Sequence, residues 1–138
     1  MLSRKKIIET ITNDSGELHP WTTWPTLHRG VNNELHRIQF INQPLKEASK
    51  YPPIWEILQK NGLNVGVFGS LQSYPPIKSK NISFYLPDTF APTDDAYPKI
   101  LKNFQSFNLT FQTLSNPGSS SNAFKGTKVA VNIGSLSL

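Results

Sequence analysis

The sequence predicts an α/β protein, and two neighbouring stretches carry this prediction. Residues 53–70 contain a short helical pattern, a glycine stop and then an uncharged run over residues 63–68. Uncharged runs of this kind are typical of a strand that is covered on both faces of a sheet. Residues 82–86, Ile-Ser-Phe-Tyr-Leu, form a second strand candidate, which Pro87 closes because proline cannot donate to a sheet ladder.

The helical pattern begins at Pro53, which suits a first helical position because the N–H that proline lacks would have no partner there. Ile54, Ile57 and Leu58 recur on one side at helical spacing, as in an amphipathic helix. Gly62 follows at a place where helices commonly end in a left-handed residue, a conformation that costs glycine little. These signals predict a helix of about two turns that leads directly into the strand.

The remaining elements are predicted less sharply. Gly66, inside the predicted strand, allows another chain segment to approach closely, and residues 69–70 end that strand in a turn. This turn lies at the carboxyl edge, where open α/β sheets bind their ligands. Residues 98–114 alternate apolar and polar side chains, and their first half suits a helix. Residues 1–12 fit either a short helix or an edge strand.

Length and composition limit the class of protein to which the chain can belong. The 138 residues suffice for one domain, which we expect over residues 1–115, with residues 116–138 as a linker-like or disordered tail. The formal net charge of +5 comes mostly from scattered side chains, so we expect a solvated surface and no nucleic-acid partner. The absence of cysteine excludes disulfides and thiolate metal sites. With no signal peptide or membrane span visible, the cytoplasm is the default location, and the oligomeric state stays open.

The chemically densest stretch is residues 17–30, which contains hydroxyl, imidazole and indole side chains. A threonine hydroxyl at the start of a short helix can act as a nucleophile, because the helix N-terminus stabilises its anionic form. The alternative is that Thr22 or Thr23 caps a helix with Pro25 in its first turn. His28 and His36 are too few for a metal site by themselves, and a hydrogen-bonded structural role is the alternative for each.

Three motifs, taken in order, resemble the alkaline phosphatase superfamily. Residues 55–69 contain Trp-Glu-Ile-Leu, Asn-Gly and Val-Gly-Val-Phe-Gly, which are similar to a helix–glycine–strand unit of that superfamily. Residues 24–38, with Trp-Pro-Thr-Leu-His-Arg-Gly and Glu-Leu-His-Arg-Ile, are similar to its "Thr-Gly … His-Gly-Ile" passage. Residues 84–91 resemble its type I phosphodiesterase/nucleotide pyrophosphatase-like branch. The resemblance covers roughly residues 16–111 and implies part of a three-layer sandwich with an incomplete, mostly parallel sheet.

The resemblance also implies a chemistry. Such enzymes hydrolyse phosphate or sulfate esters of small molecules with two divalent metal ions, usually zinc, and a Thr or Ser nucleophile. The triplet Thr23-Trp24-Pro25 matches the family's Thr–aromatic–Pro, so Thr23 is the first candidate for the catalytic nucleophile. Thr26 is the second candidate and Thr22 the third, because the spacing from Thr23 to Gly30 is shorter than in the family.

The chain departs from the family where metals would be bound. The family takes ligands from an aspartate at the end of an early strand and from later Asp-x-x-x-His and Asp-His motifs. Here Asp14 sits in a turn cluster, and no histidine follows His36. We therefore expect an internal or truncated piece of a hydrolase that is inactive and metal-free by itself. The alternative from another class is a small non-catalytic binding or interaction module for an anionic partner.

Overall fold

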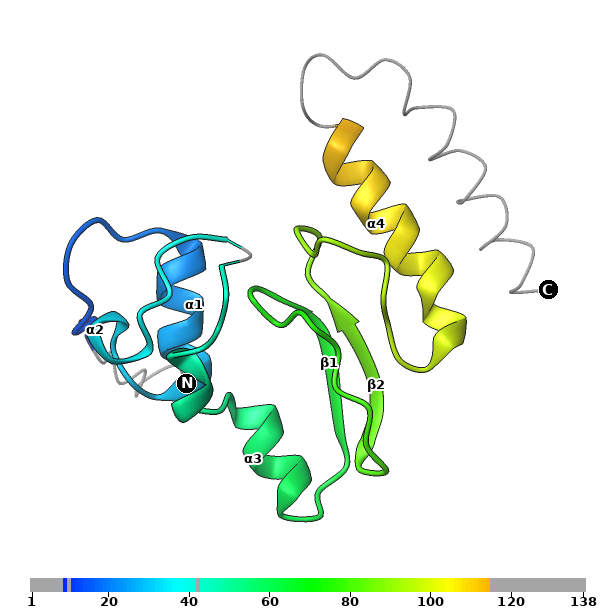
Figure 1. The fold of residues 1–138 in the computed structure, drawn as a ribbon, viewed down its shortest axis with the longest axis horizontal. Helices are drawn as coiled ribbons and strands as arrows, with labels where there is room; N and C mark the ends of the chain where they lie inside the picture. The colour runs from blue at the N-terminus through cyan, green and yellow to red at the C-terminus, as the bar shows by residue number, and fades with distance from the viewer. Residues whose placement is uncertain (1–8, 10, 42, 115–138) are drawn as a thin grey trace, which may run out of the picture.

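The computed structural model describes residues 9, 11–41 and 43–114 (Figure 1). The predicted linker or tail over residues 116–138 lies outside the described residues, as does most of the ambiguous segment 1–12. In chain order the elements are α1 (Pro20–Arg29), α2 (Asn33–His36), the 3₁₀ turn η1 (Ala48–Lys50), α3 (Ile54–Lys60), β1 (Val65–Ser70), β2 (Ile82–Pro87), the 3₁₀ turn η2 (Lys99–Leu101) and α4 (Lys102–Leu114).

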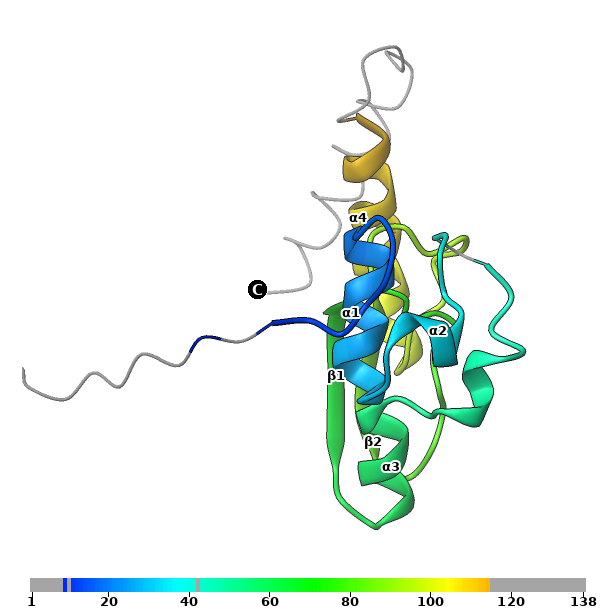
Figure 2. The ribbon, with the colours of Figure 1, turned by 90° about the vertical axis from the view of Figure 1, so that its left-hand side faces the viewer.

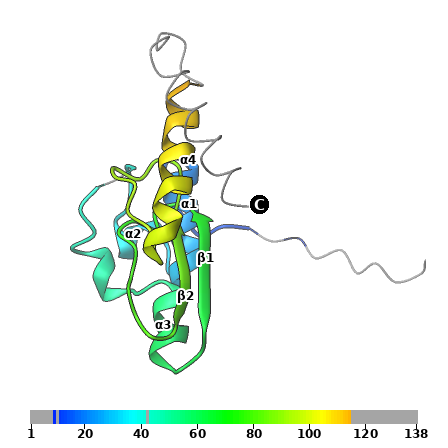
Figure 3. The same cartoon turned by 90° about the vertical axis from the view of Figure 1, so that its right-hand side faces the viewer.

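The two strands form a parallel sheet that lies between helices. Val65 of β1 aligns with Ile82 of β2, and Val67 aligns with Tyr85. Helices α1 and α3 lie on one side of the sheet and α4 on the other, as the front view and the two side views show (Figures 1, 2 and 3). The prediction of an α/β protein is thus confirmed at the level of a small parallel sheet between helices. Within the described residues, no helix has the length and apolar character needed to cross a membrane.

The core forms where α3 packs on β1 and β2. Its buried members are Trp55, Val67, Ile82 and Tyr85, and the Trp55 and Tyr85 rings meet edge to face with centroids 6.3 Å apart. The aliphatic side predicted for α3 is not the buried side, because Ile54 remains 47 % exposed. A helix of seven residues buries little surface, and the large indole of Trp55 provides most of what it covers.

Gly66 has the predicted role of a close-approach position. A Cβ atom built on it would lie 2.3 Å from Cε1 of Phe84, since that ring lies against the backbone of β1. The helix stop at Gly62 is also confirmed, with φ at +84°. Both glycines were predicted from local pattern; Gly62 is favoured by its backbone conformation and Gly66 by the Phe84 ring that lies against it.

The predicted bounds and burial of the first strand need correction. The strand covers Val65–Ser70 instead of residues 63–68, so Gly69 and Ser70 belong to it. It is not covered on both faces, because the side chain of Phe68 is 69 % exposed. Among the described residues only β2 pairs with β1, which leaves the other edge of β1 without a strand neighbour.

The loops at the carboxyl end of the sheet are held by buried polar groups. Tyr85 donates its hydroxyl to the carbonyl of Ser73 at 2.6 Å. The carboxylate of Asp88, directly after β2, accepts the N–H of Phe90 at 2.8 Å, and burial raises the pKa of this carboxyl. The side chain of Gln105 in α4 donates to the carbonyl of Asp88 at 2.9 Å. These bonds fix the loop after β1, the end of β2 and α4 relative to one another.

The contact between Gly66 and Phe84 predicts the cost of a side chain at position 66. Gly66→Ala should destabilise the protein by about 1–3 kcal/mol, because the Phe84 ring must move away from its packed position. Urea denaturation measures this change. In a Phe84→Ala background the same substitution should cost much less, and an equal cost in both backgrounds would show that the ring is not the cause.

The open edge of β1 predicts self-association of the isolated chain. An uncharged edge with an exposed phenylalanine offers both unpaired backbone groups and apolar surface to a second molecule. Phe68→Lys should reduce concentration-dependent association in sedimentation experiments. Leu27→Lys adds the same charge at a 72 % exposed position on α1 and should leave association unchanged. A wild-type chain that stays monomeric at all concentrations would contradict this expectation.

Candidate functional site

The candidate site is built on α1, whose start differs from the prediction. His19 is the N-cap, and its carbonyl accepts the N–H groups of Thr22 and Thr23 at 2.9 and 3.0 Å. Pro20 occupies the first turn, where its missing N–H costs nothing, while Pro25 lies inside the helix. The predictions that Thr22 or Thr23 caps the helix and that Pro25 lies in its first turn are therefore wrong.

Thr23, the first candidate nucleophile, lies within the helix with its hydroxyl turned to the backbone. Its Oγ1 donates to the carbonyl of His19 at 3.2 Å, the usual local bond of a threonine in a helix. Thr22 is buried, with 3 % of its surface exposed. Thr23 is the fourth residue of α1, so it lies near the helix start, but its hydroxyl is held by the backbone.

Thr26, the second candidate, lies among side chains that suit chemistry. Its Oγ1 is 2.7 Å from Oδ1 of Asp14 and 3.0 Å from Nε2 of His36. The carbonyl of Thr22, at 3.3 Å, is a more distant acceptor for the same hydroxyl. Thr26 is half-buried, so its hydroxyl is held by the fold without being sealed in the core. The structure thus brings together three side chains that are separated by 10 and 12 residues in the sequence.

The hydrogen bonds around His36 determine which atoms donate and which accept among His36, Thr26 and Asp14. The N–H of Ile38 donates to Nδ1 of His36 at 3.0 Å, so a neutral ring carries its proton on Nε2. Burial lowers the pKa of His36, which keeps the ring neutral at pH 7, although Asp14 acts to raise this pKa and Arg29 to lower it. Nε2–H therefore donates to Thr26 Oγ1, and the Thr26 hydroxyl donates to Asp14.

Asp14 was not predicted as a site residue, because its surroundings in the sequence read only as a turn. The structure turns its carboxylate towards Thr26, and the backbone N–H of Asn33 at the start of α2 donates to the same Oδ1 at 2.8 Å. Its other oxygen accepts the hydroxyl of Thr12 at 3.1 Å. A carboxylate with several donors is held in one orientation, which a solvated turn residue would not be.

His28 lies on another face of α1 and makes a separate contact. Its Nε2 is 3.0 Å from Oγ of Ser70 at the end of β1, and its ring contacts Trp55 with centroids 4.8 Å apart. Burial, with a smaller contribution from the charge of Arg29, lowers the pKa of His28 to about 4. His28 is thus a neutral, hydrogen-bonded histidine that joins α1 to the sheet.

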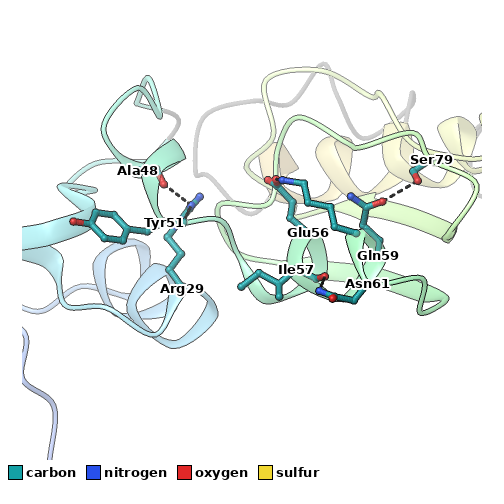
Figure 4. Close-up of polar contacts among 9 residues, drawn as sticks. Arg29, Ala48, Tyr51, Glu56, Ile57, Gln59, Asn61 and Ser79 are labelled. Carbon is teal, nitrogen blue, oxygen red and sulfur yellow. Dashed lines mark hydrogen bonds and ion pairs between the residues drawn. The ribbon is translucent and has the colours of Figure 1, made fainter.

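Arg29 fixes the end of α1 to the segment that leads into α3. Its Nη1 donates to the carbonyl of Ala48 at 2.9 Å and also to the carbonyl of Tyr51 (Figure 4). Gly30, with φ at +66°, then ends the helix. Arg29 therefore has a structural role at the end of α1.

The remaining acidic side chains lie elsewhere. Asp94 accepts the hydroxyl of Ser106 and pairs with Lys102 at 3.1 Å, while Asp95 accepts the hydroxyl of Thr93. The Asp94 contacts connect the loop before η2 to α4, and the Asp95 contact lies within that loop. Across residues 9, 11–41 and 43–114, no three His, Cys, Asp or Glu side chains gather closely enough to hold a metal ion. The described residues therefore do not fit the two-metal centre that the resemblance implies.

Comparisons with protein-family models, with curated proteins and with solved structures find no match to this chain. The functional assignment therefore depends on the geometry around Thr26 together with the motif resemblance.

Buried His36 and half-buried His28 predict how stability depends on pH. The pKa of His28 is about 4 in the folded state and near 6.5 when unfolded, so the unfolded state binds more protons between these values. Stability is then full above about pH 6.5 and falls as the pH drops towards 4, and the lowered pKa of His36 acts in the same direction. Thermal melting should show a lower Tm at pH 5 than at pH 7.5.

The matched variants for this experiment are His28→Gln and His19→Gln. His28→Gln should flatten the pH dependence, because the glutamine does not take up a proton on unfolding. His19→Gln leaves both buried imidazoles in place and should retain the loss at pH 5. A wild-type Tm that is unchanged or higher at pH 5 would refute the assignment of His28 as a buried neutral group.

Proposed function

We propose that this chain carries the threonine nucleophile of a phosphate-ester hydrolase, and that this nucleophile is Thr26. The observation that carries the proposal is the position of its hydroxyl, 2.7 Å from the carboxylate of Asp14 and 3.0 Å from the imidazole of His36. The motif resemblance to type I phosphodiesterases supplies the substrate class, an ester of phosphate or sulfate with a small molecule.

The three side chains have distinct roles in this proposal. A carboxylate at hydrogen-bond distance can accept the hydroxyl proton as a general base, so Asp14 activates Thr26. His36 already donates its Nε2–H to Thr26 Oγ1 and is therefore not the base. It stabilises the negative charge that develops on this oxygen. Burial keeps His36 neutral, so it does not form an ion pair that would compete with Thr26 for Asp14.

The proposed reaction has two displacements. In the first, Thr26 Oγ1 forms a bond to phosphorus, the bond from phosphorus to the leaving oxygen breaks, and the hydroxyl proton passes to Asp14. The leaving oxygen departs as the alkoxide or phenoxide and takes a proton from solvent. In the second, water forms a bond to phosphorus and the bond from phosphorus to Thr26 Oγ1 breaks. Asp14 returns its proton to Thr26, the attacking water gives up a proton to solvent, and the phosphate product is released.

Geometry favours Thr26 over the other threonines. The hydroxyl of Thr23 is held by a carbonyl oxygen of its own helix, which can orient it but cannot accept its proton for catalysis. Thr22 is almost fully buried, which keeps a phosphate group away from it. Thr26 is the seventh of ten residues in α1, so the activation comes from Asp14 and not from the helix N-terminus that the sequence suggested.

The proposal extends to the architecture and the metals of the resembled family. A small parallel sheet with helices on both sides is compatible with part of a three-layer sandwich. Two divalent ions, usually zinc, supply charge neutralisation in such enzymes. Because the described residues form no metal site, the ligands for these ions would have to come from outside the described part of the chain.

Three lysines of the described residues give no support to the alternative of a binding module for an anionic partner. Lys50, Lys60 and Lys102 are each paired with a carboxylate on the surface, so they do not form a free basic patch. Retention on a polyanion column that is lost with rising salt would nevertheless identify such a module, since phosphate contacts by lysines are screened by salt.

The proposed role of Thr26 predicts the effect of removing its hydroxyl. In the natural polypeptide that carries this sequence, assayed with zinc on bis-nitrophenyl phosphate and nitrophenyl phosphate, Thr26→Val should lower turnover about 1,000-fold or more. Thr23→Val is the matched control and should change turnover little. Loss of activity with Thr23→Val instead would move the assignment to Thr23, and absence of any turnover by the natural polypeptide would overturn the hydrolase proposal.

The purified 138-residue chain should by itself be catalytically silent. The described residues cannot hold a metal pair, and Asp14 activates the hydroxyl without neutralising the negative charge of the phosphate. We expect no zinc retained through dialysis and no hydrolysis of either nitrophenyl ester above blank. Stoichiometric zinc with metal-dependent turnover by this chain would contradict its interpretation as part of a larger enzyme.

A further inference from the structure

We propose that Asn33 is a positioning residue, which holds the carboxylate of Asp14 against Thr26 and His36 by clamping residues 14–15 to the start of α2. The term positioning residue rests on the proposed function, but the contacts and the test below do not require turnover. Nothing in the motif resemblance points to Asn33.

The clamp consists of hydrogen bonds from both the backbone and the side chain of Asn33. Its backbone N–H donates to Oδ1 of Asp14 at 2.8 Å, the same oxygen that accepts the Thr26 hydroxyl. Its side-chain Oδ1 accepts the N–H of Ser15 at 3.0 Å, and its Nδ2 donates to the carbonyl of Ser15 at 2.7 Å. The side chain thus pairs with both backbone groups of Ser15, as a neighbouring strand would.

The segment around Asp14 has few other means of support. Asn13, Ser15 and Gly16 are all exposed, and an exposed turn without buried apolar contacts has little reason to keep one conformation. The bond from Thr12 to Asp14 lies within this same turn and does not attach it to the rest of the fold. The Thr26 hydroxyl ties the Asp14 carboxylate to α1, and the paired bonds to Asn33 attach the backbone of the turn across 18 residues of sequence.

The pKa of His36 reports whether the Asp14 carboxylate is in place. The negative charge of Asp14 acts to raise the pKa of His36, while burial and the positive charge of Arg29 lower it. Asn33→Ala keeps the backbone N–H that donates to Asp14 but removes both side-chain bonds to Ser15. If these side-chain bonds hold the turn, Asp14 moves towards solvent in the variant and its raising effect is lost, so the pKa of His36 falls further. If Asn33 only supports the fold of α2, its loss exposes His36 to water, and the pKa rises towards the ordinary value of 6.5. The two roles thus predict opposite signs.

The experiment is an NMR titration of the His36 ring in the full 138-residue chain. Asn33→Ala should lower the pKa of His36 by most of the amount that Asp14→Asn lowers it. The double variant Asp14→Asn/Asn33→Ala should show no further decrease, because the charge that Asn33 positions is already gone. Hydrogen exchange of the Ser15 amide should also accelerate in Asn33→Ala, since that amide loses its acceptor.

Two outcomes would overturn the proposal. One is a pKa of His36 that is unchanged or raised in Asn33→Ala. The other is a double variant in which adding Asn33→Ala to Asp14→Asn lowers this pKa by as much as Asn33→Ala lowers it in the wild type. Asn33→Gln, which keeps the amide and shifts it by one methylene, replaces Asn33→Ala if the alanine variant fails to fold, with the same expected sign. A negative titration result leaves the turnover test of Thr26 unaffected, and loss of the hydrolase proposal leaves the titration result unaffected, so the two failures are distinguishable.

Discussion

The described structure depends above all on the burial of Tyr85. Its ring meets Trp55 of α3 edge to face, its backbone exchanges two hydrogen bonds with Tyr97, and its hydroxyl holds the carbonyl of Ser73. One residue of β2 thereby fixes the helix on one side of the sheet, the far edge of β2 and the loop after β1. Burial raises the pKa of the Tyr85 hydroxyl, so it remains a hydrogen-bond donor at any pH that a protein meets.

The candidate site is connected to this core through α1 and not through the strands directly. His28 joins α1 to Ser70 at the end of β1, and Arg29 joins it to the carbonyls of Ala48 and Tyr51. These bonds fix the rotation of α1 about its axis. His28 lies across the helix from Thr26 and Arg29 lies one turn further along, so both contacts set the direction of Thr26 towards Asp14 and His36. A surface hydroxyl is thus positioned by a helix that is itself held by the core.

The chemistry proposed for Thr26 follows from the order of donors around it. The Ile38 N–H sets the tautomer of His36, His36 then donates to Thr26, and Thr26 donates to Asp14. A chain of hydrogen bonds with one direction leaves the hydroxyl proton on the side of the carboxylate, which is where a general base must receive it. The two histidines on neighbouring segments differ in role because their hydrogen-bond partners differ. His28 is hydrogen-bonded to Ser70, and His36 donates to Thr26.

Local chemistry in the sequence determined the α/β class, the stop at Gly62, the close approach at Gly66 and the second strand before Pro87. Each of these depends on neighbouring residues, on proline and glycine geometry or on a short apolar run, which a sequence displays directly. Tertiary structure decided that Trp55 and not Ile54 faces the core, because packing selects by size and shape and periodicity does not. The proposal of Thr26 over Thr23 also rests on tertiary contacts. That choice depends on Asp14, His36 and Asn33 meeting across 10 to 19 residues, and only the folded chain brings those groups within hydrogen-bond distance.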